Sequence, residues 1–223
     1  MIKPFATIPQ LSNRLPSPDE LKTALTNASR NVYEAFARLW LTEGFPTAFT
    51  SAPAIYEDLR GWLASQLSVH AKEVTVVGSA RMGYSLKPEP DFGRQFGPRS
   101  DLDLGVISKD LFARVASAYE EFSSDLRSGK IAPRSDRERS DWDENVKFGI
   151  RNIPRGFFDP DKIPTFNRYP VVQQVGQSMW MLKKKLDVTP GAPQVRKASI
   201  RVYRDWQSLI DNKSLNLKSV LRA

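Results

Sequence analysis

The chain has 223 residues, 40% of them hydrophobic and 26% charged, a balance typical of a folded globular protein rather than a disordered one. It has no cysteine and one histidine, His70, so disulfides, thiol catalysis and multi-histidine metal sites are excluded. A formal net charge of +8 favours polyanionic partners such as nucleic acid or nucleotides.

Membrane insertion and export are not indicated by the sequence. No apolar run approaches the roughly 20 residues needed to span a bilayer. Residues 1–10 lack the apolar core of a signal peptide. We therefore expect a cytoplasmic protein with no membrane partner.

The chain begins with two predicted amphipathic helices. Residues 17–44 start with a serine N-cap and a proline, repeat apolar residues at helical spacing, and end at Gly44. Residues 52–70 repeat this plan. Both helices are expected to pack into the core, within an N-terminal helical region at residues 1–70.

The middle of the chain alternates strands and helices. In chain order we expect a strand at 73–78, a helix from Ser79, a loop at 87–100, a strand at 102–107, a helix at 108–129 and a strand at 145–153. Two helices, at about 171–187 and 193–210, close the chain. The pattern predicts an α/β or α+β fold in one compact unit over residues 1–223, with its core at 71–155 and a basic helical region at 156–223.

Two carboxylates lie at the start of the second strand. Asp101 and Asp103 in "SDLDLGVI" are two positions apart, so on a strand both project to one face while the leucines between them enter the core. Such a pair is stabilised by a hard divalent cation, and Mg²⁺ prefers one or two carboxylates together with substrate phosphates.

The first strand ends in a turn suited to an anion. In "VTVVGSARMGYSL", Gly78 permits close approach, and the Ser79 hydroxyl and free backbone N–H groups at a helix start can bind a phosphate. Each motif alone is more often only structural. Together, in this order, they point to nucleotidyl transfer.

The combination "VVGSARMGYSL…SDLDLGVI" resembles the signature of the polymerase-β-like nucleotidyltransferase superfamily. The longer Gly-Ser form is similar to the oligoadenylate-synthase and bacterial cyclic-dinucleotide synthase (CD-NTase) branch, with Tyr84 where threonine is usual. "VRKASIRVYRDWQSL" looks like that branch's C-terminal helix, with Arg201, Arg204 and Trp206 in its pattern. The resemblance covers roughly residues 50–210.

This resemblance implies a nucleotidyltransferase fold, a small mixed β-sheet flanked by the N-terminal helices and the C-terminal helical region. By position, Gly78 and Ser79 would hold the triphosphate of an NTP, and Asp101 and Asp103 would be catalytic and bind Mg²⁺ or Mn²⁺. Arg81 and Arg204 are further candidates for phosphate contacts, although a solvated helix face is the favoured explanation of Arg204.

Two departures from the family pattern concern the loop and the third acid. The loop at 87–100 is an insert, either a lid whose Arg94 and Arg99 reach phosphate or a tolerated surface loop. The family's third carboxylate is expected on the next strand, where this chain has Gly149 and Arg151. Three acids just before that strand are substitutes if the register differs: Asp141, Asp143 and Glu144.

Without a third acid, catalysis with two carboxylates, an acid supplied by a protein partner, and nucleotide binding without turnover all stay open. The leading hypothesis is a metal-dependent enzyme that transfers NMP to a nucleotide, an RNA end such as that of tRNA, or a protein. The resemblance suggests a role in bacterial phage defence or toxin–antitoxin signalling. The alternatives are a degenerate nucleotide or nucleic-acid sensor and a scaffold for another protein.

Overall fold

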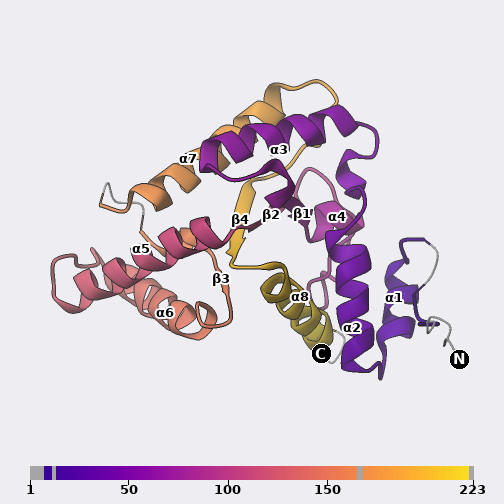
Figure 1. The fold of residues 1–223 in the computed structure, drawn as a ribbon, viewed down its shortest axis with the longest axis horizontal. Helices are drawn as coiled ribbons and strands as arrows, with labels where there is room; N and C mark the ends of the chain where they lie inside the picture. Colours follow the sequence, from indigo (N-terminus) through magenta and orange to yellow (C-terminus); the bar gives the residue numbers. More distant parts are fainter. Residues whose placement is uncertain (1–7, 12–13, 165–167, 221–223) are drawn as a thin grey trace, which may run out of the picture.

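The computed structural model describes residues 8–11, 14–164 and 168–220. Its centre is a four-stranded mixed sheet with strand order β1-β2-β4-β3 (Figure 1). The strands are β1 (Val74–Val77), β2 (Leu102–Ile107), β3 (Phe157–Phe158) and β4 (Ala198–Tyr203). β4 runs parallel to β2, whereas β1 pairs with β2, and β3 with β4, in antiparallel fashion.

Helices surround this sheet. The α-helices are α1 (Pro18–Leu25), α2 (Arg30–Phe36), α3 (Pro53–Leu67), α4 (Ser79–Met82), α5 (Lys109–Arg127), α6 (Asp136–Asn152), α7 (Pro170–Val188) and α8 (Trp206–Val220). α2 continues as the π-helix η1 (Ala37–Thr42), and single 3₁₀ turns form η2 (Thr47–Phe49), η3 (Ala71–Glu73) and η4 (Pro160–Lys162).

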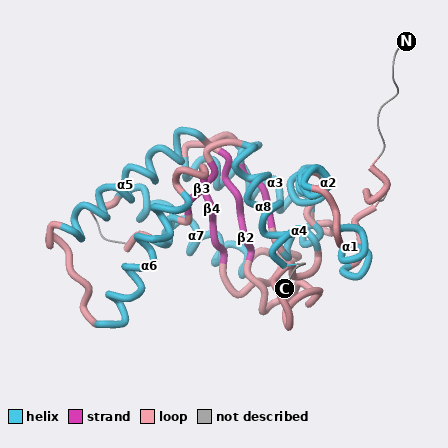
Figure 2. The backbone as a smooth tube through the Cα atoms, turned by 90° about the horizontal axis from the view of Figure 1, so that it is seen from below, coloured by secondary structure: helices cyan, strands magenta, loops and turns pink. Residues whose placement is uncertain are grey.

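The two faces of the sheet are covered by different helices (Figure 2). Because successive side chains on a strand alternate in direction, β2 contributes to both layers. Leu102, Leu104 and Val106 are buried in one cluster with side chains of α3, α5 and α7. Ile107 joins a second cluster, with Tyr203 of β4 and side chains of α1, α2, η1 and α8. The sheet face that α8 covers is the face that carries Asp103.

Several sequence predictions are confirmed. The strands at 73–78 and 102–107 are β1 and β2, and the helices at 52–70, 108–129 and 171–187 are α3, α5 and α7. The fold is a mixture of helices and a small mixed sheet, as the α+β prediction requires. Ser17 caps α1 as expected: its hydroxyl accepts the Glu20 N–H, and the Glu20 side chain accepts the Ser17 N–H at 2.8 Å.

The predicted strand at 145–153 is wrong, because these residues belong to the long helix α6. Ser135 caps that helix by accepting the Glu138 N–H at 3.2 Å. Trp142 and Gly149 are buried at helical spacing, and a Cβ at Gly149 would lie 2.1 Å from the Tyr119 ring of α5. The glycine allows two helices to meet and does not mark a strand.

The predicted helix at 193–210 is also wrong. Residues 198–203 form strand β4, and α8 begins only at Trp206. The sheet therefore takes two strands from the region at 156–223 that was expected to be helical. The single helix predicted at 17–44 is interrupted as well, because Asn27 adopts a positive φ of 58° between α1 and α2.

Within the part of the chain that the structure describes, no helix has both the length and the apolar character needed to cross a membrane.

Candidate functional site

The Gly-Ser turn and the second carboxylate meet where β1 and β2 pair. Val77 is the register partner of Asp103, so Gly78 follows directly beside this aspartate. A Cβ placed on Gly78 would lie 3.1 Å from Asp103 Oδ2, and the residue has φ 67° and ψ −147°. Only glycine adopts this backbone region without strain. The turn therefore requires glycine for both conformation and space.

Ser79 begins α4, which is a single turn of four residues. So short a helix has a small macrodipole, because the dipole grows with the number of aligned peptide units. The phosphate-binding capacity predicted from the sequence thus depends on local groups. These groups are the Ser79 hydroxyl and the backbone N–H groups of the turn.

These residues line a cavity of about 170 Å³. Its wall consists of Gly78, Ser79, Ser85, Leu86, Lys87, Asp103, Leu41 of η1, and Lys213, Asn216 and Leu217 of α8. Two lysines, Lys87 between the two motifs in the sequence and Lys213 on α8, thus line the same space as Asp103. A cavity with a hydroxyl, two ammonium groups and one carboxylate is suited to a phosphate with a bound cation.

Asp103 is linked to β4 and to α8. Its Oδ1 accepts a hydrogen bond from the Ser199 hydroxyl at 2.5 Å, because Ser199 is its register partner on β4. Burial and the positive charge of Arg201 lower the pKa of Lys213 to about 8, against the opposing effects of Asp103 and Asp159. Lys213 is therefore a cation that an arriving anion would stabilise in its charged form.

Asp101 is held by Arg196, in the segment before β4. The Arg196 Nε and Nη2 donate to the two carboxylate oxygens at 2.9 and 2.8 Å, and Lys197 Nζ lies 3.9 Å from Oδ2. The hydrogen bonds from Arg196 keep the pKa of Asp101 below its usual value, and Lys87 adds to this electrostatically. Arg196 in turn experiences the charge of Asp103, so both aspartates share one electrostatic environment.

Two of the predicted phosphate-binding arginines lie elsewhere. Arg81 is buried, and both of its terminal nitrogens donate hydrogen bonds to the Gly44 carbonyl at 3.2 Å. It lines another cavity, together with Trp206. Arg204 follows the far end of β4 and donates to Asp205 at 3.0 Å. Since Ser199 at the other end of β4 contacts Asp103, the structure does not bring Arg204 to the site.

The acids considered as a third carboxylate also lie apart from the cavity. Asp141, Asp143 and Glu144 are exposed on α6, where Glu144 pairs with Lys147 at 2.7 Å. Gly149 and Arg151 are on this helix too. Asp159, directly after β3, is an acid that the sequence did not indicate. Its two oxygens both accept hydrogen bonds from Arg201 of β4, and with Asp103 it acts electrostatically on Lys213, but it does not line the cavity.

The loop at 87–100 is tied to the chain just after α4. Ser85 and Arg94 form a backbone hydrogen bond at 2.8 Å, and Arg94 pairs with Asp91 at 3.0 Å. From this loop it is Lys87, rather than Arg94 or Arg99, that lines the cavity. Tyr84 directs its hydroxyl away, to the Pro16 carbonyl at 2.9 Å.

The donor set fits a hard divalent cation only in part. Carboxylate oxygens of Asp101 and Asp103 are ligands that Mg²⁺ prefers, and the remaining positions can be filled by phosphate and water. Among the described residues, no group of three or more acidic, histidine or cysteine side chains is placed to hold a metal. Metal binding through Asp101 also requires Arg196 to release it.

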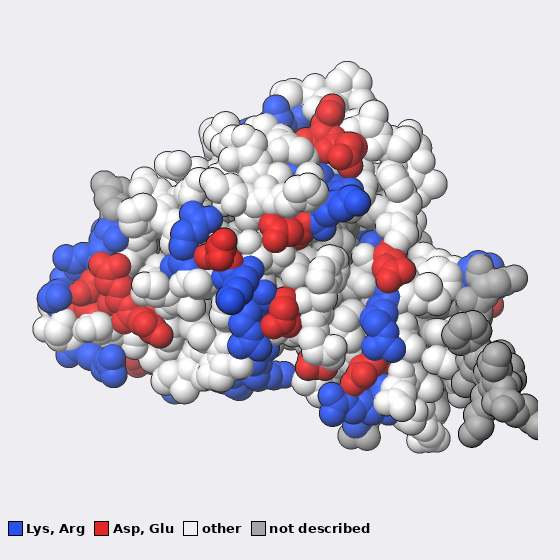
Figure 3. Space-filling model, in the orientation of Figure 1, with Lys and Arg blue, Asp and Glu red and all other residues white. Residues whose placement is uncertain are grey.

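Several basic residues of the C-terminal region pair with acids. Lys183 pairs with Asp187, Arg196 with Asp101, Arg201 with Asp159 and Arg204 with Asp205. Figure 3 shows lysine and arginine interspersed with aspartate and glutamate over the face in view. The surplus positive charge thus forms no single continuous basic surface on that face.

Comparison of the chain with protein-family models, curated proteins and solved structures found no match.

Proposed function

We propose that the protein is a magnesium-dependent nucleotidyltransferase, which binds the phosphates of an NTP in the cavity between α4 and α8. The observation that carries the proposal is the contact of Gly78 with Asp103. A turn that only glycine forms without strain places its backbone amides beside a carboxylate that projects from the neighbouring strand. Nucleotidyl transfer needs hydrogen-bond donors for phosphate and a carboxylate that can bind a metal ion, close to each other.

Residues in and near the cavity have distinct roles in this proposal. Gly78 and Ser79 donate hydrogen bonds to phosphate oxygens, and Lys87 and Lys213 neutralise their charge. Asp101 and Asp103 would hold Mg²⁺, which when bound supplies Lewis-acid stabilisation of charge on the triphosphate. Arg196, once it leaves Asp101, is a fork-shaped donor for a phosphate.

The reaction joins an acceptor hydroxyl oxygen to the α-phosphorus of the NTP. The bond from this phosphorus to the oxygen that bridges to the β-phosphate breaks, and pyrophosphate leaves. The hydroxyl proton passes to water or to a carboxylate. A cavity of about 170 Å³ is smaller than the several hundred Å³ of typical small-molecule sites, so the nucleoside extends outside it, toward the acceptor.

The experiment that tests the proposal combines transfer and binding. The protein is incubated with each α-³²P-labelled NTP, Mg²⁺ or Mn²⁺, and bulk tRNA, beside an Asp101→Ala/Asp103→Ala double variant. We expect label in RNA, in protein or in a new small product with the wild type alone. Equal labelling by the double variant contradicts the assignment of the two carboxylates.

A second candidate function, nucleotide sensing without turnover, has one specific observation in its favour. Both oxygens of Asp101 are occupied by Arg196, and both oxygens of Asp159, which acts electrostatically on Lys213 as Asp103 does, are occupied by Arg201. Metal-dependent NTP binding without transfer to any acceptor would identify this function. Absence of NTP binding would contradict both candidates and favour a scaffold.

A further inference from the structure

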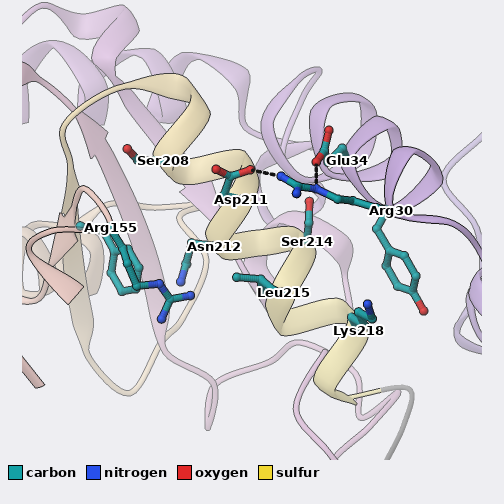
Figure 4. Close-up of a pocket in the computed structure, with 11 residues that line it drawn as sticks. Arg30, Glu34, Arg155, Ser208, Asp211, Asn212, Ser214, Leu215 and Lys218 are labelled. Carbon is teal, nitrogen blue, oxygen red and sulfur yellow. Dashed lines mark hydrogen bonds and ion pairs between the residues drawn. The ribbon is translucent and has the colours of Figure 1, made fainter. Parts of the chain in front are cut away.

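A second and larger cavity, of about 400 Å³, lies between α2, α8 and the segment before β3 (Figure 4). α8 forms one wall of this cavity and one wall of the cavity around Gly78. The two cavities are lined by different α8 residues. The larger cavity is lined by Ser208, Asp211, Asn212, Ser214, Leu215 and Lys218, and the cavity around Gly78 by Lys213, Asn216 and Leu217. The larger cavity is therefore separate from the proposed NTP site.

The charges in this cavity are unequally matched. Arg30 donates to Glu34 at 2.6 Å and lies 3.7 Å from Asp211, so one arginine serves both acids (Figure 4). Arg155 and Lys218 have no carboxylate within ion-pair distance among the described residues. The lining thus has three cations and two carboxylates, and its one surplus positive charge attracts an anion from solution.

The rest of the lining is largely apolar and aromatic. Tyr33 and Phe157 are buried, and Leu215 of α8 is 50% exposed although it is a large apolar side chain. The Arg155 guanidinium lies over the Phe157 ring, 5.3 Å from its centroid, and donates to Asn152 at 3.2 Å. This arginine is thus positioned on a flat apolar platform.

The cavity has the size and composition of a small-molecule site, which is a largely apolar space of roughly 300–1,000 Å³ with a few convergent polar groups. We propose that it binds a small organic anion, with one flat ring packed on the apolar lining and one phosphate or carboxylate attracted by the positive charge of Arg155 and Lys218. Neither a bare inorganic anion nor an uncharged ring would use both parts of the lining.

The probe for this site is phenyl phosphate, which carries one ring and one phosphate. Its binding is followed by ¹H–¹⁵N chemical-shift titration of the full chain. We expect saturable binding, about tenfold tighter than that of inorganic phosphate or of benzyl alcohol, because each of these lacks one half of the interaction. Equal affinity for inorganic phosphate and phenyl phosphate, or no saturable binding, would overturn the proposal.

Matched variants locate the site. Arg155→Gln and Lys218→Gln are each expected to weaken phenyl phosphate binding about tenfold, the effect of losing one charge-assisted hydrogen bond. Arg155→Lys keeps the charge and should recover part of the affinity. Lys147→Gln on α6 removes an equal charge far from this cavity, and Lys213→Gln removes one from the proposed NTP site.

Lys147→Gln should bind phenyl phosphate as the wild type does, and Lys213→Gln should leave unchanged the titration of the amides that line this cavity. If Lys213→Gln alone weakens binding, the probe occupies the cavity around Gly78 and the second site is refuted, whereas the proposed NTP site is supported. If Lys147→Gln weakens binding as much as Lys218→Gln, the attraction is only that of net charge and the proposal fails.

Discussion

Arg196 forms a bidentate ion pair with Asp101: its Nε and Nη2 donate to the two carboxylate oxygens at 2.9 and 2.8 Å. The two residues are 95 positions apart in the chain, and they meet because β4 runs parallel to β2 with Ala198 beside Leu102. A carboxylate occupied in this way is a poor ligand for a metal. Arg196 therefore sets how readily the proposed metal site forms.

Arg196→Gln should strengthen binding of Mn²⁺, used as a spectroscopic substitute for Mg²⁺. Removing the competing guanidinium frees Asp101, and because Arg196 is 63% exposed, we expect a modest gain of about threefold to tenfold. Electron paramagnetic resonance of free Mn²⁺ measures the change. The control is Lys197→Gln, which removes an equal charge 3.9 Å from Asp101 without removing a hydrogen bond. Unchanged affinity in Arg196→Gln, or an equal gain in the control, would contradict the competition.

Gly78→Ala should destabilise the protein and weaken NTP binding together. Alanine is strained at φ 67° and ψ −147°, and its Cβ would crowd Asp103 Oδ2. Strain of this kind costs about 1–3 kcal/mol, measured as the free energy of unfolding in urea. Gly61→Ala is the matched control, because its Cβ meets nothing within 4 Å in helix α3. That variant should gain up to about 1 kcal/mol. If Gly78→Ala has the free energy of unfolding and the NTP affinity of the wild type, the turn does not require glycine.

The affinity for NTP should fall as the pH rises through about 8, the pKa of Lys213. Above this pH the free protein loses a cation that the phosphates contact, so binding must first return the proton. Lys213→Arg, which stays charged, should keep its affinity constant from pH 7 to pH 9.5 in fluorescence titrations with a labelled NTP. A wild type without this dependence would place Lys213 outside the phosphate site.

The same lysine affects stability with a defined sign. Its pKa is lower in the folded protein than the usual value of 10.5, so between about 8 and 10.5 the unfolded chain binds more protons. The contribution of Lys213 to the free energy of unfolding therefore rises with pH in this window. A comparison of the wild type with Lys213→Met isolates this contribution.

The part of the site that the sequence predicts is the part built from local pattern. β1 and β2 are short apolar runs. β1 ends just before Gly78 and β2 begins just after Asp101, and their pairing brings the two motifs together. β3 has only two residues and depends on pairing with β4, so no local signal marks it. Residues 195–209 resemble a C-terminal helix, which favours a helix at 193–210, whereas β4 is fixed by its parallel pairing with β2. Lys213 was missed because it reaches the site from a helix whose position only tertiary packing fixes.

Ser199→Asp would place a third carboxylate beside Asp103, at the register position from which the serine hydroxyl now donates at 2.5 Å. Without metal the added like charge should lower the free energy of unfolding by about 1–3 kcal/mol. A bound cation relieves this repulsion, so Mg²⁺ should stabilise the variant more than the wild type, by an amount that rises with the ratio of metal concentration to dissociation constant. Thermal unfolding with EDTA and with Mg²⁺ measures both effects. Ser199→Asn is the uncharged control of similar size. If it gains as much from Mg²⁺ as Ser199→Asp, the cation does not bind at Asp103, and the metal-dependent mechanism loses its site.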